Sequence, residues 1–344
     1  MFFASDNTAP VPPQILAALA SANEGYAMGY GNDPLTHAVE ARIRDLLEAP
    51  EAAVRLVSTG TAANALALAL FCPPWAAVFC HDDAHATRDE CGAPEFFTGG
   101  AKLVGIPGDH GRITPEGVIQ ALGRIGTSGV HGVQRGCLTL TNVTEAGTVY
   151  TPAEIAALAA LAHAHSLPVH LDGARFANAL VATQATPAEM TWKAGVDVLS
   201  LGGTKNGLMG AEAVVIFDPA KAWELDLRRK RAGHLASKMR YIAAQFDGWL
   251  ADGLWRDLAA QANAMAARMA TGLRAIPGVV LAHPVDANIL FPQWPAGAHA
   301  RLKAAGAAYY AWDAPAPDRE AARLVTSWST TEADVDGFLA VLAG

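Results

Sequence analysis

Short apolar runs alternate with helical patterns between residues 52 and 217 of the chain. Runs typical of buried strands occur at Val54–Ser58, Ala77–Cys80, Leu103–Ile106, Cys137–Leu140, Pro168–Leu171, Val196–Leu201 and Ala213–Phe217. Helices are predicted over the Ala/Leu-rich segment Ala62–Leu70 and after Thr114 and Thr151, each of which is followed by Pro at the first helical position. This alternation predicts an α/β fold whose mostly parallel sheet is flanked by helices on both faces.

The pattern changes after Asp218. Residues 220–275 carry apolar side chains at helical spacing almost continuously, which predicts a long helical connector. Strand-like runs then mix with helices, and they lie at Val279–Ala282, Asn288–Phe291 and Leu324–Trp328. We therefore expect residues 1–250 to form an N-terminal arm and a large domain, and residues 251–344 to form a smaller α+β domain.

Composition narrows the function classes. Of the 344 residues, 51% are hydrophobic and 17% charged, so the chain can bury a sizeable core. The net charge of −8 argues against nucleic-acid binding, since the densest basic run is Arg228–Arg231 and such runs are usually solvated helix faces. No signal peptide is visible, and no apolar stretch reaches the roughly 20 residues of a membrane span. Four scattered cysteines without a CxxC pair indicate reduced thiols. We expect a soluble, cytoplasmic protein.

Ser58–Asn64 follows a strand and opens a helix. Gly60 lets the backbone approach an anion, the free N–H groups at the helix start point toward it, and Thr61 adds a hydroxyl. This segment is a candidate phosphate cradle. A Thr that only caps a buried helix explains the same residues.

Asp172 lies at the end of a predicted parallel strand. Strand alternation places Val169 and Leu171 on one face of the sheet and His170 and Asp172 on the other. Ligands of open α/β sheets bind at the carboxyl ends of the strands. A carboxylate there can keep a pyridinium nitrogen protonated, although an Asp that caps the next helix remains an alternative.

Lys205 stands in a glycine-rich segment, Gly202–Gly207, directly after an apolar strand. Schiff-base chemistry favours a lysine on a short, tightly turned loop, partly desolvated so that its amine can be neutral. The hydroxyls of Ser200 and Thr204 are candidates for the same phosphate. A surface lysine is the alternative interpretation.

His81 and His85 have the spacing of a zinc-binding HExxH helix. They follow a strand-like run, and no third ligand is evident, so we expect no metal. A single His placed over an aromatic cofactor ring is the better functional hypothesis.

These features occur in the order that a pyridoxal 5′-phosphate (PLP) site requires: an anion cradle, a His, an Asp at a strand end and a Lys. The sequence resembles the fold-type I PLP enzymes over nearly its whole length, and closely resembles the low-specificity L-threonine aldolases of the β-eliminating-lyase group. The residues that carry the resemblance are Ser5-Asp6, Tyr30–Pro34, Thr59–Asn64, Ala84-His85, His170–Phe176, Thr204–Asn206 and Arg323–Thr326.

The resemblance implies a role for each matching residue. Lys205 would carry PLP in a Schiff base, Asp172 would pair with the ring nitrogen and His85 would stack on the ring. The phosphate would lie at Gly60 and Thr61. The positions that hold the substrate carboxylate in the family are matched by Ser5, Arg175 and Arg323, and Arg175 would also lie near the cofactor's phenolic oxygen. Tyr30 is a further substrate-binding candidate. The family also implies a homodimer or homotetramer with its sites at subunit interfaces, and Arg228–Arg231 and Arg240 are candidates to enter the neighbouring site.

Thr144 is the point of departure from the family. Many members have a His in this loop, tied to recognition of the substrate β-hydroxyl, and this chain has Thr144 in its place. We expect Thr144 beside the substrate, a roomier pocket next to Cβ, and a preference for aryl side chains such as that of phenylserine.

The reaction that the resemblance implies is cleavage of an L-3-hydroxy-α-amino acid, such as L-threonine, L-allo-threonine or phenylserine, to glycine and an aldehyde. His85 or a water molecule is the expected base. A PLP-dependent β-eliminating lyase or an aminotransferase is the nearest alternative. A non-catalytic protein with a dinucleotide-binding sheet is disfavoured because no GxGxxG follows a strand.

Overall fold

The computed structural model describes residues 1–344 and contains two sheets. The larger has seven strands in the order β1-β7-β6-β5-β4-β2-β3. They are β1 (Ala53–Val57), β2 (Ala76–His81), β3 (Lys102–Ile106), β4 (Gln134–Thr141), β5 (Val169–Gly173), β6 (Val198–Gly202) and β7 (Glu212–Ile216). β7 runs antiparallel to both of its neighbours, and the pairs from β6 to β3 are parallel. Every strand predicted between residues 52 and 217 is present, and the mostly parallel sheet is confirmed.

Helices cover both faces of this sheet. One face packs against α3 (Gly60–Phe71) and α9 (Ala222–Arg231), and the other packs against α2 (Pro34–Leu46), α7 (Pro152–Ala164), α8 (Phe176–Thr183) and α10 (Arg240–Leu250). Every residue from Ala62 to Leu70 is buried, and their small side chains let α3 lie close to the strands. The remaining helices of this part are α1 (Pro13–Ala22), α4 (His85–Arg88), α5 (Ala93–Thr98) and α6 (Pro115–Leu122).

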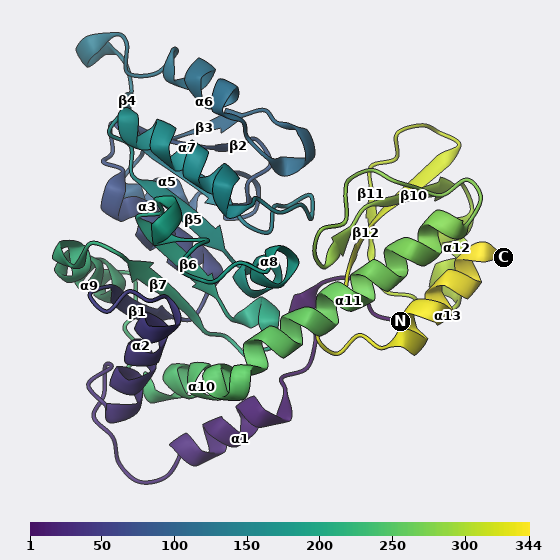
Figure 1. The fold of residues 1–344 in the computed structure, drawn as a ribbon, viewed down its shortest axis with the longest axis horizontal. Coiled ribbons are helices and arrows are strands. Elements are labelled where there is room, and N and C mark those ends of the chain that lie inside the picture. Colours follow the sequence, from purple (N-terminus) through teal and green to yellow (C-terminus); the bar gives the residue numbers. More distant parts are fainter.

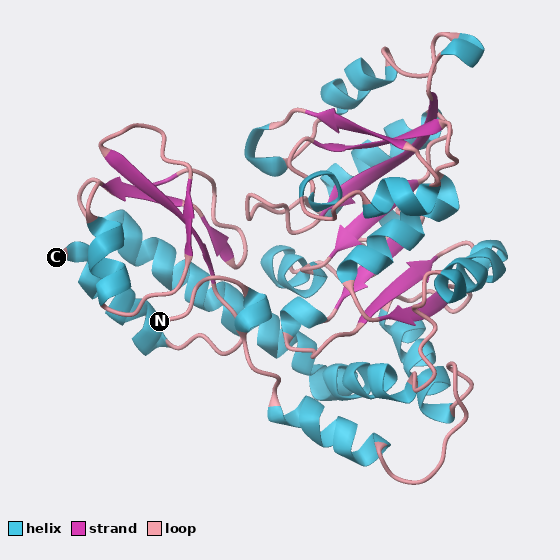
Figure 2. Ribbon diagram, turned by 180° about the vertical axis from the view of Figure 1, so that it is seen from behind, coloured by secondary structure: helices cyan, strands magenta, loops and turns pink.

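The second sheet is antiparallel and belongs to the smaller lobe (Figure 2). Its strands are β8 (Val280–Leu281), β9 (Ile289–Leu290), β10 (Pro292–Pro295), β11 (Tyr310–Trp312) and β12 (Arg319–Val325), and its helices are α12 (Ala298–Ala304) and α13 (Glu332–Ala343). Phe3, from the start of the chain, lies in the core of this lobe with its ring 5.3 Å from that of Phe338. Both termini therefore lie in the smaller lobe (Figure 1).

The almost continuously helical connector predicted over residues 220–275 is present, and the structure divides it into three helices. It comprises α9, α10 and α11 (Leu254–Ala275), separated by a stretch at 232–239 and by a turn at 251–253. That turn breaks the helical path because Asp252 and Gly253 both have left-handed φ, 50° and 74°. In the smaller lobe, the run predicted at Leu324–Trp328 is also corrected, because β12 lies earlier, over Arg319–Val325.

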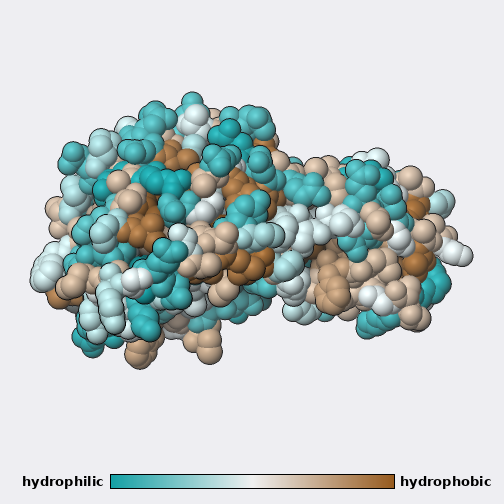
Figure 3. All heavy atoms as spheres, turned by 90° about the horizontal axis from the view of Figure 1, so that it is seen from below, coloured by the Kyte–Doolittle hydropathy of each residue, from teal (hydrophilic) through white to brown (hydrophobic).

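α11 joins the two lobes (Figure 1). Its first turns place Trp255 and Leu258 in the core of the large sheet, and its later turns place Met265 and Met269 in the core of the small lobe. The division at residues 250 and 251 stays a prediction. Figure 3 shows the two lobes joined by a narrower region, with apolar patches on the larger lobe. None of the helices combines the length and the apolar character needed to cross a bilayer.

Candidate active site

A cavity of about 980 Å³ lies between the two lobes, where loops from the large sheet meet the small sheet. Its lining draws on the N-terminal arm, the large sheet and the small lobe. The members that matter for chemistry are Ser5, His85, Glu145, Arg175, Lys205 and Arg323. Of the predicted site residues, the structure thus brings together Ser5, His85, Arg175, Lys205 and Arg323.

Lys205 lies on a short 3₁₀ turn, Thr204–Asn206, directly after β6. The glycines around it are required by close packing: a Cβ on Gly202 would lie 2.5 Å from the Ala174 carbonyl oxygen, and one on Gly203 would lie 2.4 Å from Leu208 Cδ1. Gly207 ends the turn with a left-handed φ of 99°. The Lys205 amine makes no hydrogen bond or ion pair within the chain, so it is available to a ligand in the cavity.

Asp172 is buried at the carboxyl end of β5, as predicted. Its Oδ2 accepts a hydrogen bond from Asn64 Nδ2 at 2.9 Å, and its Oδ1 accepts one from the Ala174 N–H at 3.0 Å. It does not cap the next helix, since α8 begins after Arg175. No cation lies within ion-pair distance of Asp172, and a buried anion without a cation is unfavourable. The site therefore fits a cationic N–H group such as a protonated pyridine ring.

His85 belongs to a network of side-chain hydrogen bonds that could not be predicted from the sequence. Its Nδ1 lies 2.9 Å from Glu90 Oε1, and the same oxygen accepts a hydrogen bond from Asn64 Nδ2 at 2.8 Å. Asn64 thus connects Glu90 to Asp172. The hydrogen bond to Glu90 raises the pKa of His85. Glu90 orients the imidazole and favours its protonated form, as a carboxylate partner does for many functional histidines.

Arg175 is held by Asp6, a second partner that sequence reasoning missed. Arg175 Nε donates to Asp6 Oδ2 at 2.6 Å and Nη2 donates to Oδ1 at 3.0 Å, with both side chains almost fully buried. Two of the guanidinium nitrogens are thereby committed, which fixes the plane of the group at the cavity wall. The match of Ser5-Asp6 to the family was the available signal, but it gave Asp6 no role.

Arg323, like Lys205, is a cavity cation without a partner in the chain. It lies on β12 opposite Tyr310 and makes no ion pair within 4 Å. Burial lowers the pKa of Arg323, and a partly desolvated cation favours binding of an anion. Ser5 Oγ, nearby in the same cavity, accepts a hydrogen bond from the Asn7 N–H at 3.2 Å. Arg323 and Ser5 are suited to a carboxylate.

The predicted phosphate cradle lies at the N-terminus of α3. Thr59 caps this helix by accepting a hydrogen bond from the Ala62 N–H at 3.2 Å, so the capping alternative is right for Thr59. Gly60 and Thr61 are half-buried, occupy the first helical turn and do not line the cavity described above. No atom lies within 4 Å of where a Gly60 Cβ would be, which leaves room for an anion at the helix start.

The hydroxyls of Ser200 and Thr204 are used within the chain. Ser200 Oγ lies 2.9 Å from His170 Nε2, in a buried pair. Thr204 Oγ1 accepts a hydrogen bond from the Ala211 N–H at 3.3 Å. Neither residue lines the cavity.

Tyr30 lies outside the cavity, on the surface. It is 49% exposed, and its ring lies under the Lys230 ammonium, 4.7 Å from nitrogen to centroid. Several members of the basic run have partners in the chain, since Arg228 pairs with Glu224 and Arg229 with Asp226. Two of the four side chains of Arg228–Arg231 are therefore already paired within this chain, which leaves fewer of them to enter a neighbouring subunit's site.

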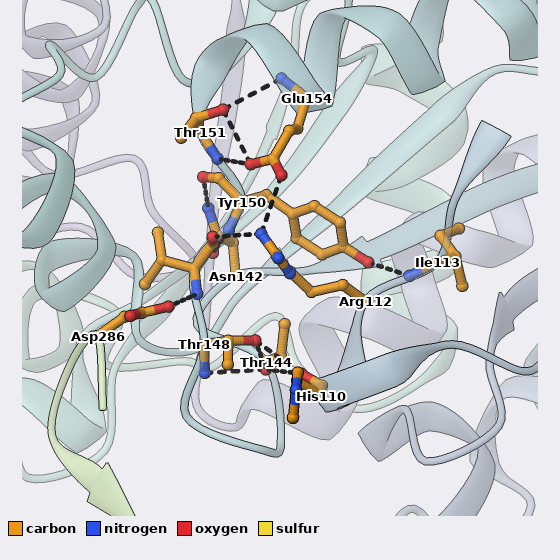
Figure 4. Close-up of polar contacts among 11 residues, drawn as sticks. His110, Arg112, Ile113, Asn142, Thr144, Thr148, Tyr150, Thr151, Glu154 and Asp286 are labelled. Carbon is orange, nitrogen blue, oxygen red and sulfur yellow. Dashed lines mark hydrogen bonds and ion pairs between the residues drawn. The ribbon is translucent and has the colours of Figure 1, made fainter. Parts of the chain in front are cut away.

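Thr144 also departs from its predicted place. It is 1% exposed, its hydroxyl lies 2.8 Å from Thr148 Oγ1, and it does not line the cavity (Figure 4). The neighbouring residue, Glu145, lines the cavity instead. The expected widening beside Cβ thus has no support from the position of Thr144.

The small lobe gives the cavity an aromatic wall. The Phe291 ring lies 5.3 Å from that of Trp312 and 5.2 Å from that of His283, and all three line the cavity. His283 Nδ1 in turn lies 3.0 Å from Nδ1 of His110, which comes from the larger lobe. Edge-to-face aromatic surface of this kind suits an apolar or aryl substituent.

His81 is turned away from His85. Its Nε2 lies 2.9 Å from the Gly108 carbonyl oxygen, and its Nδ1 accepts from the Asp83 N–H at 3.0 Å. No cluster of three His, Cys, Asp or Glu side chains in the structure could hold a metal ion.

A large mostly parallel sheet, a lysine on the turn after β6 and a buried, unpaired Asp at the end of β5 define a fold-type I arrangement. The chain belongs to the beta-eliminating lyase family, whose model matches residues 3–294.

The chain is also similar to individual proteins named threonine aldolase. The chain is 41% identical, over 97% of its length and 94% of the relative, to the low specificity L-threonine aldolase of Pseudomonas sp. (strain NCIMB 10558). It is 42% identical to the protein of the same name from Pseudomonas aeruginosa, over 95% of this chain and 93% of that one. A solved threonine aldolase from Leishmania major superimposes with a TM-score of 0.93 at 32% identity, covering 99% of this chain and 98% of that one.

Proposed function

We propose that the protein is a PLP-dependent aldolase that cleaves L-3-hydroxy-α-amino acids of the threonine, allo-threonine and phenylserine type to glycine and an aldehyde. One arrangement carries the proposal. The free Lys205 amine and the unpaired Arg323 cation line one cavity together with His85. Asp172 is not among the lining residues, but hydrogen bonds through Asn64 and Glu90 connect it to His85. The relatives at 41% and 42% identity bear the corresponding name.

The cofactor would be held by residues from four elements. Lys205 would bond to it covalently, Asp172 would keep its ring nitrogen protonated, His85 would contact the ring, and the start of α3 at Gly60 and Thr61 would bind its phosphate. Bound PLP supplies an acceptor for the electron pair that is left on Cα when the Cα–Cβ bond breaks.

The substrate would be held by its carboxylate. Arg323 and Ser5 are suited to this group, and the fixed guanidinium of Arg175 adds a second positive charge. The substituent on Cβ would lie against the wall formed by Phe291, Trp312 and His283. We attribute room for an aryl substituent to that wall and not to Thr144.

The test is the identity of the products. Purified protein loaded with PLP is incubated with L-threonine, L-allo-threonine or L-phenylserine. Glycine and the aldehyde are quantified against ammonia and the 2-oxo acid that β-elimination would give, which is 2-oxobutanoate from the threonines and phenylpyruvate from phenylserine. Equimolar glycine and aldehyde are expected. The family description favours β-elimination as the second candidate, and formation of 2-oxobutanoate or phenylpyruvate together with ammonia would establish it instead.

We further infer a homodimer or homotetramer whose sites lie at subunit interfaces. The support is a set of exposed large apolar side chains on the larger lobe: Tyr26, Met28, Tyr30, Trp223 and Leu227. Sedimentation that shows a fully active monomer would refute this. The free cysteines fit a cytoplasmic protein, and the amino-acid substrate is its expected small-molecule partner.

A further inference from the structure

Glu145 is a cavity carboxylate that no residue of the chain holds. It is half-buried and lines the cavity together with His85, Lys205, Arg175 and Arg323. It makes no side-chain hydrogen bond and no ion pair. A partly desolvated carboxylate without a protein partner is a candidate for interaction with a ligand.

The backbone around Glu145 is fixed by a turn that two backbone hydrogen bonds close. The Gly147 N–H donates to the Thr144 carbonyl at 2.9 Å, which makes Glu145 and Ala146 the two central residues of a β-turn. The Thr144 N–H donates to the Thr148 carbonyl at 2.9 Å, and the two threonine hydroxyls lie 2.8 Å apart. Thr144 therefore closes the turn that presents its neighbour.

The turn is also held from outside, by both lobes. Thr148 Oγ1 donates to the His110 carbonyl at 2.7 Å, and the Val149 N–H donates to Asp286 Oδ2 at 3.1 Å (Figure 4). Gly147 has a left-handed φ of 84°, and a Cβ there would lie 2.6 Å from the Ile289 carbonyl oxygen. The carboxylate of Glu145 is thus carried by a backbone with little freedom to move, as a reacting group requires.

The charge of Glu145 acts on the site. It favours the protonated forms of His85, Arg175 and Arg323. Four other acids line the same cavity, and all four are exposed: Asp83, which pairs with Arg88 at 2.8 Å, and Asp89, Asp109 and Asp313. Glu145 is the half-buried carboxylate of the five.

We propose that Glu145 is the base that takes the proton from the substrate β-hydroxyl. The proposal rests on the aldolase function proposed above. The hydroxyl O–H bond breaks and its proton passes to a Glu145 carboxylate oxygen. The O–H electron pair forms the C=O bond of the aldehyde as Cα–Cβ breaks, and the Cα–Cβ pair stays on Cα, which later takes a proton to become glycine. Glu145 then releases its proton to solvent.

The experiment compares Glu145→Gln, Glu145→Asp and the control Asp89→Asn, all loaded with PLP. Three quantities are measured: kcat for L-phenylserine and L-threonine cleavage, glycine affinity by spectral titration, and exchange of the glycine Cα proton with deuterium. Glycine has no β-hydroxyl. Its affinity and its Cα-proton exchange therefore depend on the cofactor, Lys205 and Asp172, but not on a base that takes the hydroxyl proton.

Glu145→Gln should lower kcat for cleavage about 10²–10⁴-fold and leave glycine affinity and exchange at wild-type values. Glu145→Asp, which keeps the carboxylate on a shorter side chain, should recover part of the loss, and Asp89→Asn should match the wild type. The proposal is overturned if Glu145→Gln keeps more than a tenth of wild-type kcat, or if glycine exchange falls as far as cleavage. If the wild type forms no glycine and aldehyde, the aldolase proposal fails first; if it does, only the role of Glu145 is at stake.

Discussion

Asp6→Asn should destabilise the fold strongly, because it removes one charge from a buried pair. The Asp6 and Arg175 side chains are 0% and 2% exposed, so water does not screen the interaction. Asp6 accepts from Arg175 at 2.6 and 3.0 Å and from Asn288 Nδ2 at 3.1 Å. An Asn at this position replaces one accepting oxygen with an NH₂ donor, which would then face the N–H donors of Arg175 or Asn288. The guanidinium stays buried without its counter-charge.

Removing one partner of a buried pair costs about 3–5 kcal/mol. The assay is urea unfolding of the PLP-loaded protein at pH 7, followed by tryptophan fluorescence. The matched control is Asp336→Asn, since Asp336 binds Arg268 through the same two-point geometry, at 2.8 and 2.8 Å, but on the surface. That variant should unfold close to the wild type because water screens an exposed pair.

The pH dependence of the unfolding free energy provides a second test of the pair between Asp6 and Arg175. Burial acts to raise the pKa of Asp6, but the charge and hydrogen bonds of Arg175 outweigh it, so the pKa lies below its ordinary value. A carboxyl with a lowered pKa stabilises the fold above its unfolded pKa, about 3.9, and that contribution is lost as the pH falls through the folded value. The advantage of the wild type over Asp6→Asn should be full at pH 6 and shrink below about pH 4. A loss no larger than that of Asp336→Asn, or an advantage that is constant down to pH 3, refutes the reasoning.

Three further substitutions test the site. Lys205→Ala should abolish nearly all turnover, and steady-state rates above a few per cent of the wild type would contradict the assignment. Asp172→Asn should still bind PLP, seen by absorbance, but lower kcat about 100-fold, since a buried charge contact of about 3 kcal/mol corresponds to that factor; an unchanged kcat would contradict it. Thr148→Val keeps the volume but removes the 2.7 Å hydrogen bond to the His110 carbonyl, which is left with only the longer 3.4 Å contact from Thr144 Oγ1, so it should cost about 1–3 kcal/mol in urea unfolding, and full stability would show that the turn is held otherwise.

Local patterns were sufficient to predict the large sheet and its lysine. The strands are short apolar runs bounded by turn residues, and Lys205 could be singled out because its glycines are adjacent in sequence. Strand alternation was sufficient for Asp172, since its side depends only on its neighbours. The breaks in the long helical connector had a local signal too, in Gly233 and Gly253, but the apolar periodicity continues on either side of both.

Partners far apart in sequence could not be predicted. Asp6 and Arg175 are 169 residues apart, and Asn64 and Asp172 are 108 apart, so only the folded chain shows that each pair meets. Thr144 and Glu145 differ by one position, and which of them lines the cavity depends on the hydrogen bonds that close one β-turn. A turn of this kind leaves no periodic pattern in the sequence.

If this cavity holds PLP through Lys205, the cofactor can be located on the chain. The PLP-loaded protein is treated with borohydride, digested, and its peptides are sequenced by mass spectrometry. We expect a single cofactor adduct, on the peptide that contains Lys205. An adduct on Lys193 or Lys230, or none on any peptide, would contradict it.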